Sequence, residues 1–167
     1  MDLRTLLVGL AHAALLAVGL LLVIVDARTH RLPNRIVLPT LAVAAGLIVV
    51  DAGATGRWAP LLRAGAGMLL LCGFYLLLRA VSRAGLGGGD VKLSAVVGLV
   101  LGWHGWQALA VGAASAFVLA AVYAIALMAL RRADGSTRIA FGPWMVAGAV
   151  IGVIAGGAPM SATTALW

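Results

Sequence analysis

The chain has 167 residues, of which 63% are hydrophobic and 10% are charged, and its mean hydropathy is +1.12. A soluble domain of this length could not bury so much apolar surface, whereas a bilayer solvates it directly, so the composition predicts one integral membrane domain over residues 1–167. The net charge of +7 does not indicate a nucleic-acid partner, because the basic residues lie in short connections without an aromatic-rich surface for base stacking.

Apolar segments follow one another along the whole chain, and a membrane-spanning helix needs about 20 such residues. The six predicted spans are residues 5–25, 36–53, 60–81, 91–103, 105–130 and 140–160. The first is interrupted only by His12 and has fewer arginines before it than after it, which favours a retained helix over a cleaved signal peptide. The fourth is short. It either lines a wet cavity or joins the fifth in one helix kinked at 102–106, which would leave five spans.

Lysine and arginine decide between six spans and five. With six spans, nine of the twelve basic residues lie in the first, third and fifth connections: Arg28, Arg31, Arg35, Arg79, Arg83, Lys92, Arg131, Arg132 and Arg138. The positive-inside rule therefore predicts an all-α protein with six transmembrane helices, these three connections in the cytoplasm and both termini outside. The two halves of the chain share no sequence similarity, so an inverted repeat is not indicated.

Two of the five aspartates border apolar segments on the predicted cytoplasmic side. Asp26 follows "LLLVIV" and Asp90 precedes "VKLSAVVGLV", so residues 64 positions apart are expected at one depth and on one face. An aspartate inside a membrane costs about 2.5–3.5 kcal/mol, so this placement indicates function. Alternatively, Asp90 is only the N-cap of the fourth helix, and Asp26 is an interfacial residue ending the first. The other acids are predicted at the N-terminus (Asp2), in an outer connection (Asp51) and in a turn (Asp134).

Two facing carboxylates are suited to one kind of chemistry. Close together they cannot both ionise, so one takes a proton from water while the other protonates a leaving group. Gly87 and Gly89, which can adopt positive φ, are expected to turn the adjacent loop sharply and to let an extended substrate approach. His12 is predicted to be a packed, hydrogen-bonded residue rather than a proton relay, and His30 and His104 are expected at the interface.

Other hydrolytic chemistries lack their residues. The sequence contains no HExxH, GxSxG or P-loop motif, and Cys72 is its single cysteine, so we expect neither a metal site nor a cofactor.

Three stretches resemble motifs of the type IV prepilin peptidases, the bacterial leader peptidases that process pilins. "GLGGGDVKLSAVVGLVLGW" is similar to the family's GxGD segment, with matches at Gly85, Gly87, Gly89, Asp90, Lys92, Leu93, Gly102 and Trp103. "DARTHRLPNRIVLP" looks like the stretch that holds the family's other aspartate, with matches at Asp26, Leu32, Pro33, Asn34 and Pro39. "IAFGPWMVAG" resembles the PFGP motif near the last helix, with Phe141, Gly142 and Pro143 in place and Ala140 replacing the first proline.

The resemblance covers about residues 20–160 and implies that Asp26 and Asp90 are the catalytic pair of an aspartic membrane endopeptidase. The GxGD form is shared with presenilin and signal peptide peptidase. The implied reaction removes a short basic leader from the membrane-embedded N-terminus of a prepilin or pseudopilin, on the cytoplasmic side of the cytoplasmic (inner) membrane and after a glycine. Long family members carry paired CxxC motifs that accompany methylation of the new N-terminus. Because this chain has one cysteine, we expect a peptidase without methyltransferase activity.

The remaining motif residues are assigned mainly structural roles. Pro33 and Asn34 are expected to start the second helix, with Asn34 as its cap, and Gly142-Pro143 to set where the sixth begins. Lys92 either binds a substrate carboxylate or a lipid phosphate, or extends to the membrane interface, and we favour the interface.

Two other functions are compatible with a small membrane protein that carries aspartates. An ion-coupled transporter or channel would need polar groups in the middle of several spans, which are nearly bare here apart from His12. An inactive assembly subunit of a pilus or secretion system would be expected to have lost one of the two aspartates, and both are present.

Overall fold

The structure is a computed structural model that describes residues 3–29, 33–82, 87–131 and 140–157. These residues form six α-helices, as predicted, and contain no strand. The helices are α1 (Leu3–Thr29), α2 (Asn34–Thr55), α3 (Trp58–Val81), α4 (Gly88–His104), α5 (Trp106–Ala129) and α6 (Gly142–Gly157). Each overlaps one of the six segments predicted from the sequence.

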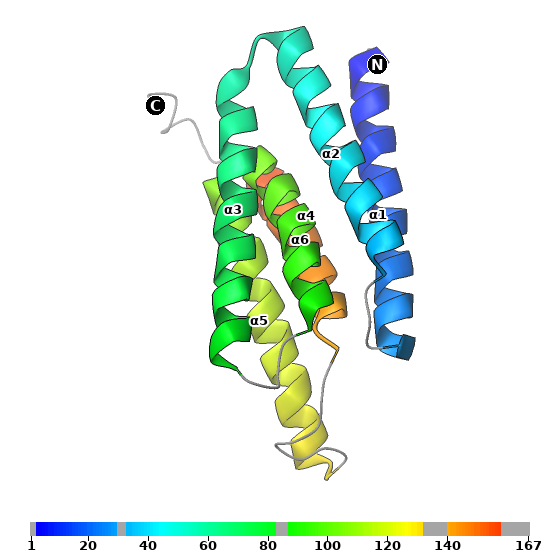
Figure 1. Ribbon diagram of the computed structural model, residues 1–167, viewed down its shortest axis with the longest axis vertical. Helices are drawn as coiled ribbons and strands as arrows, with labels where there is room; N and C mark the ends of the chain where they lie inside the picture. The colour runs from blue at the N-terminus through cyan, green and yellow to red at the C-terminus, as the bar shows by residue number, and fades with distance from the viewer. Residues whose placement is uncertain (1–2, 30–32, 83–86, 132–139, 158–167) are drawn as a thin grey trace.

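The helices alternate in direction, so the bundle has two distinct ends (Figure 1). One end, which we call the α3–α4 end, holds the last turns of α1, α3 and α5 and the first turns of α2, α4 and α6. The opposite end, called the α2–α3 end, holds the short connections from α2 to α3 and from α4 to α5. The first, third and fifth connections, which are rich in arginine, therefore belong to one end.

Gly105 separates α4 from α5 and decides the number of helices. Its φ of 142° and ψ of 165° are accessible to glycine and strained for other residues, so the chain turns here instead of continuing as a kinked helix. The alternative with one long helix through residues 102–106 is therefore wrong.

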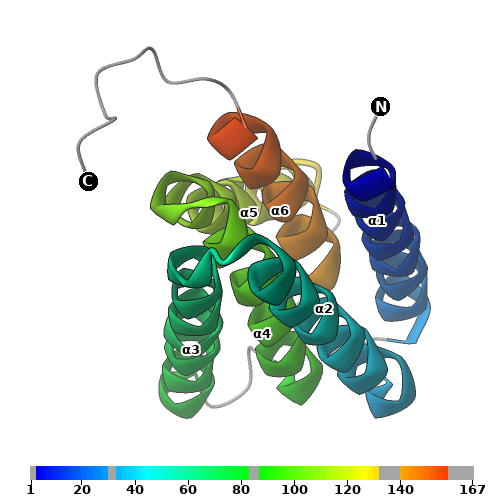
Figure 2. The same ribbon diagram turned by 90° about the horizontal axis from the view of Figure 1, so that it is seen from above.

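Helix α4 is the buried centre of the bundle. Eleven of its 17 residues are buried, and α2, α3, α5 and α6 all pack on it (Figure 2). Its length is about 26 Å at 1.5 Å per residue, shorter than a full span. The helices α1, α2, α3 and α5 each hold an apolar segment long enough to cross a membrane, whereas α4 and α6 do not reach that length. Since protein surrounds α4, its short ends do not leave backbone exposed to lipid.

Glycine contacts hold α4 directly against α3. A Cβ added to Gly67 would lie 2.6 Å from the Gly98 carbonyl oxygen, and one added to Gly102 would lie 2.6 Å from that of Arg63. In lipid, burying apolar side chains between helices gains little, so close backbone contact at small residues is a main source of attraction. Similar contacts of Gly112, Gly148 and Gly152 join α5 to α6.

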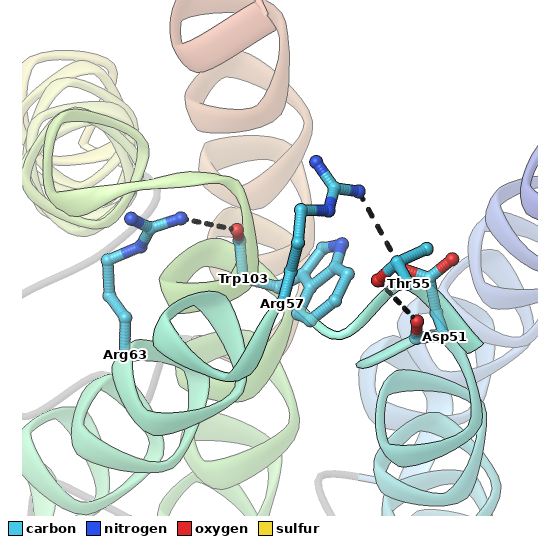
Figure 3. Close-up of polar contacts among 5 residues, drawn as sticks. All are labelled: Asp51, Thr55, Arg57, Arg63 and Trp103. Atoms are coloured by element: carbon cyan, nitrogen blue, oxygen red, sulfur yellow. Dashed lines mark hydrogen bonds and ion pairs between the residues drawn. The ribbon is translucent and has the colours of Figure 1, made fainter. Parts of the chain in front are cut away.

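Polar side chains at the α2–α3 end fix the helix ends there (Figure 3). Arg63 donates hydrogen bonds to the carbonyls of Gly102 (2.8 Å) and Trp103 (3.0 Å), and so ties the end of α4 to α3. Asp51 forms an ion pair with Arg57 at 3.9 Å. The prediction that Asp51 lies in an outer connection is wrong, because α2 extends to Thr55 and includes it.

We expect Gly67→Ala to destabilise the bundle, whereas Gly73→Ala on the same helix should be neutral or stabilising. The added methyl group meets the α4 backbone at Gly67 and open space at Gly73, where helix propensity favours alanine by roughly 0.5–1 kcal/mol. Overpacking at Gly67 should cost about 1–3 kcal/mol. Thermal unfolding of both variants in the same detergent measures the difference, and equal midpoints would contradict the backbone contact.

Candidate active site

Asp90 lies in the first turn of α4 and points back toward the start of its own helix. The extended residue Gly87 (φ −70°, ψ 148°) precedes the helix, and its N–H donates a hydrogen bond to Asp90 Oδ2 at 3.1 Å. The side chain is buried, and the unpaired N–H groups of a first turn favour a negative charge. The alternative that Asp90 is the N-cap residue is wrong, because Gly87 holds that position and Asp90 follows it by three residues.

Asp26 lies in the last turns of α1 and is joined to α6. Its side chain is 5% exposed, and its Oδ2 accepts a hydrogen bond from the Gly142 N–H at 3.1 Å. Gly142 is the first residue of α6, so a helix N-terminus faces this carboxylate. A Cβ at Gly142 would lie only 2.5 Å from Asp26 Oδ2, so this position needs glycine. Pro143 follows in the first turn, where no helical hydrogen bond is lost.

The two aspartates lie at the same end of the bundle, close enough to interact. Asp90 precedes the apolar segment 91–103, and burial raises the pKa of its carboxyl to about 6. The charge of Asp26 adds to this increase in pKa, while the hydrogen bond from Gly87 opposes it. Such a pair can hold one proton between two carboxyl groups near neutral pH, the arrangement that general acid–base chemistry requires.

The glycines before Asp90 act differently from the prediction. Neither Gly87 nor Gly89 has a positive φ, so these two residues do not provide the left-handed turn that we expected. Instead, missing side chains leave room for neighbours: a Cβ at Gly87 would lie 3.2 Å from Asp90 Oδ2, and one at Gly88 would collide with the Arg79 guanidinium. Gly85 falls outside the described residues.

Lys92 joins the two aspartate-bearing stretches. Its Nζ donates a hydrogen bond to Asn34 Oδ1 at 2.6 Å, which links the first turn of α2 to α4. The prediction that Asn34 caps α2 is wrong, because Pro33 (φ −71°, ψ 129°) is the residue before the helix and no side chain caps it. Asn34 is the first helical residue, and its amide is used in the contact with Lys92.

Sequence reasoning did not single out Tyr75 or Arg79. Tyr75 is buried in α3, interacts electrostatically with Asp90, and has its ring 5.8 Å from that of Phe141, the residue before α6. Arg79, in the last turn of α3, lies against Gly88. In the sequence, Tyr75 is noticeable as a lone tyrosine in an apolar span, and Arg79 as an arginine close to the glycine run. Neither feature indicates which helix the side chain faces.

No group of three or more histidine, cysteine or acidic side chains that could hold a metal ion occurs within the described ranges. Cys72 is a free, half-buried thiol on α3. Within the described part of the chain, each of the two carboxylates accepts a hydrogen bond from a backbone N–H group.

Residues 13–130 match the Type IV leader peptidase family. The chain is 37% identical to a prepilin leader peptidase/N-methyltransferase of Pseudomonas putida over 142 residues, which are 82% of this chain and 46% of that protein. It is 32% identical to the Bacillus subtilis protein of that name (86% and 55% covered) and 35% identical to the Escherichia coli one (79% and 57%).

The chain therefore spans about half the length of the curated relatives that it matches. No solved structure matches it. The family match includes both aspartates and ends before α6, so the contact between Gly142 and Asp26 is an observation of the structure alone. Because the match extends over most of the chain, the protein belongs to the type IV leader peptidase family.

Proposed function

We propose that this chain is an aspartic endopeptidase that removes the leader from prepilin-like proteins, with Asp26 and Asp90 activating the attacking water. The observation that carries the proposal is the pair of buried carboxyl groups, brought from α1 and α4 to one end of the bundle and each held by a backbone N–H. The relatives are named prepilin leader peptidases, which supports a prepilin or pseudopilin as the substrate. The proposal covers cleavage only, because paired cysteines have no counterpart among these 167 residues.

The environments of the two acids suggest different roles. Asp90, whose pKa is raised by burial, is the group that carries the proton, and Asp26, which faces the start of α6, is the ionised base. Asp26 removes a proton from water as the water oxygen attacks the scissile carbonyl carbon. Asp90 donates a hydrogen bond to the carbonyl oxygen. When the tetrahedral intermediate collapses, the C–N bond breaks as Asp90 gives its proton to the leaving nitrogen, which yields a new carboxyl end and a new amino end. Asp26 then passes the proton that it took from water to Asp90, which restores the starting pair.

We further propose that the α3–α4 end faces the cytoplasm. Arg28, Arg79 and Arg131 lie at this end with both aspartates, whereas Arg57 and Arg63 lie at the other. The positive-inside rule then orients the bundle with its first residues outside and the carboxyl pair at the cytoplasmic boundary. The long apolar helices support a multi-pass protein of the inner membrane.

Replacing either Asp26 or Asp90 with asparagine should lower leader cleavage by about 100-fold or more, because each change removes one partner of the acid–base pair. The assay mixes the purified protein with a prepilin and follows leader loss on a gel. Asp51→Asn is the matched control, because Asp51 lies at the opposite end of the bundle and its loss should lower cleavage far less than the loss of Asp26 or Asp90. Wild-type rates in either test variant would contradict the catalytic assignment.

The pH dependence should follow the protonation of Asp90. A raised pKa keeps the acid form present below pH about 6, and this form is lost as the pH rises through that value, so kcat should decline above it. At much lower pH both carboxyls are protonated and the base is lost. Steady-state rates between pH 4.5 and 8.5, as rough limits, should therefore give a bell-shaped profile. A flat profile with unchanged thermal stability would exclude this assignment of roles.

Gly142→Ala should reduce kcat by roughly 10-fold or more, because the added methyl group displaces the Asp26 carboxylate and removes its N–H partner from reach. Gly53→Ala is the control, since a Cβ there meets nothing within 4 Å. The cleavage rate of both variants is measured in detergent, and their circular dichroism spectra show whether both are folded. Equal activity of the two would show that the contact from α6 does not position Asp26.

A further inference from the structure

The two histidines of the described chain meet at the end of α4 that is remote from Asp90. His12 of α1 and His104 of α4 have their Nε2 atoms 3.0 Å apart, with the rings edge to face and their centroids 5.0 Å apart. The contact joins two helices that carry the proposed catalytic aspartates. Neither the family match nor the proposed chemistry gives it a role.

The hydrogen bonds of the other ring nitrogens determine where the protons are. His12 Nδ1 lies 2.7 Å from the Val8 carbonyl oxygen, and His104 Nδ1 lies 2.9 Å from that of Val100. A carbonyl oxygen only accepts, so both Nδ1 atoms carry a hydrogen. A neutral imidazole has one N–H, and both Nε2 atoms would therefore present lone pairs to each other. Two lone pairs at 3.0 Å repel, whereas one added proton makes an N–H···N bond of ordinary length.

A proton fits this gap better than a metal ion does. Zinc lies about 2.0–2.1 Å from each histidine nitrogen, which places tetrahedral ligands roughly 3.4 Å apart, more than the separation found here. Among the described residues, no three histidine, cysteine or acidic side chains are grouped so that they could hold a metal ion.

One acid and two cations lie around the histidine pair, so the Nε2–Nε2 distance and the two Nδ1 hydrogen bonds, rather than the surrounding charge, are the evidence for a shared proton. Asp51 of α2 lines the same small cavity, of about 70 Å³, as His12 and His104. Arg57 offsets part of the charge of Asp51 at 3.9 Å, and Arg63 of α3 binds the carbonyls next to His104. The acid therefore lies on α2, one cation lies in the connection from α2 to α3 and the other lies on α3, whereas the residues of α6 near His12 are apolar. Figure 3 shows Asp51, Arg57 and Arg63 of this region together with Trp103.

The register of the two helices relates this contact to the aspartates. His12 precedes Asp26 by 14 residues on α1, and His104 follows Asp90 by 14 residues on α4. The helices run in opposite directions, so the histidine pair and the aspartate pair lie at matching levels about 21 Å apart. Fourteen residues are also close to four helical turns, so the histidine and the aspartate of each helix lie on nearly the same side of that helix.

Between these two levels α1 does not rest directly on α4. A cavity of about 320 Å³ separates them, lined by apolar side chains that include Leu15, Val18 and Leu22 of α1 and Leu93, Val97 and Val100 of α4. The histidine contact is a direct hydrogen bond between α1 and α4. This contact therefore limits how far the first half of α1, which carries His12, can move away from α4.

We propose that His12 and His104 share one proton between their Nε2 atoms, and that this contact positions α1 against α4 and thereby Asp26 relative to Asp90. The positioning role rests on the proposed cleavage reaction, whereas the shared proton does not. Both histidines are positioning residues, because neither reaches the aspartates.

The proton is tested by NMR on protein labelled with ¹⁵N-histidine in nanodiscs, with His30→Asn removing the third histidine. Near neutral pH, both Nδ1 atoms and one Nε2 should be protonated, with a coupling between the two Nε2 nitrogens across the hydrogen bond. Two unprotonated Nε2 atoms would overturn the proposal. So would a metal-type shift that a chelator removes.

The positioning role is tested with two substitutions at one residue. In His12→Gln the side-chain amide can still donate to His104 Nε2 without a charge, so kcat should remain within a few-fold of the wild type and lose part of its pH dependence. In His12→Leu the contact is lost, and kcat should fall by about 10- to 100-fold with little change in KM. Wild-type kcat in His12→Leu would overturn the positioning role.

A distance measurement separates this proposal from the proposed reaction. Spin labels at the exposed positions Leu10→Cys and Gln107→Cys, in a Cys72→Ser background, report how far α1 stands from the bundle. His12→Leu should lengthen or broaden the distance distribution, and His12→Gln should not. The distance measurement does not depend on cleavage. If the protein cleaves no prepilin but His12→Leu still changes the distance distribution, the histidine contact is supported and only the catalytic assignment is wrong. Identical distributions in all three proteins would overturn the contact.

Discussion

The backbone contact between α3 and α4 is the constraint on which the arrangement of the other groups depends. Apolar side chains gain little from leaving lipid for a protein interior, so helix association here relies on close packing of small residues. Gly67, Gly98 and Gly102 allow the two backbones to touch, and α4 thereby becomes the central helix of the bundle. Because α4 carries Asp90, Lys92 and His104, its position sets where the polar contacts of these three residues can form.

Polar contacts then attach the more loosely packed helices to this centre. Asp26 binds the first N–H of α6, Lys92 binds Asn34 of α2, and His12 meets His104. The bond between Asp26 and Gly142 is buried, and in a low-dielectric interior such a bond is strong when satisfied and costly when broken, so it favours a single register between α1 and α6. Within the described residues, no buried side-chain nitrogen or oxygen lacks a partner. These three polar contacts thus position helices relative to one another.

The sequence contained enough information to predict the helices and the location of the two acids at one end of the bundle. Apolar length located all six segments, the arginine-rich connections indicated their number, and the positions of Asp26 and Asp90 at helix ends indicated a shared level. These features are local, or depend only on the alternation of helix direction across a bilayer.

Other features required knowledge of which helix faces which. The amide of Asn34 binds Lys92 instead of capping α2, because α4 brings the ammonium group within 2.6 Å. The glycines before Asp90 were expected to provide a turn, but at Gly88 the missing side chain makes room for Arg79 from α3. His12 and His104 are 92 positions apart, and no pattern in either helix indicates that they meet. Pairwise contacts between helices are tertiary information that periodicity does not contain.

The equal spacing of histidine and aspartate on α1 and α4 has a consequence for how these segments can change in evolution. One inserted or deleted residue between His12 and Asp26 would rotate one group relative to the other by about 100° and shift it by about 1.5 Å. The same holds between Asp90 and His104. Substitutions that keep these segments apolar are tolerable, but changes in their length are not. Homologues that keep all four residues should therefore align through both stretches without gaps, while the connections between helices vary freely in length.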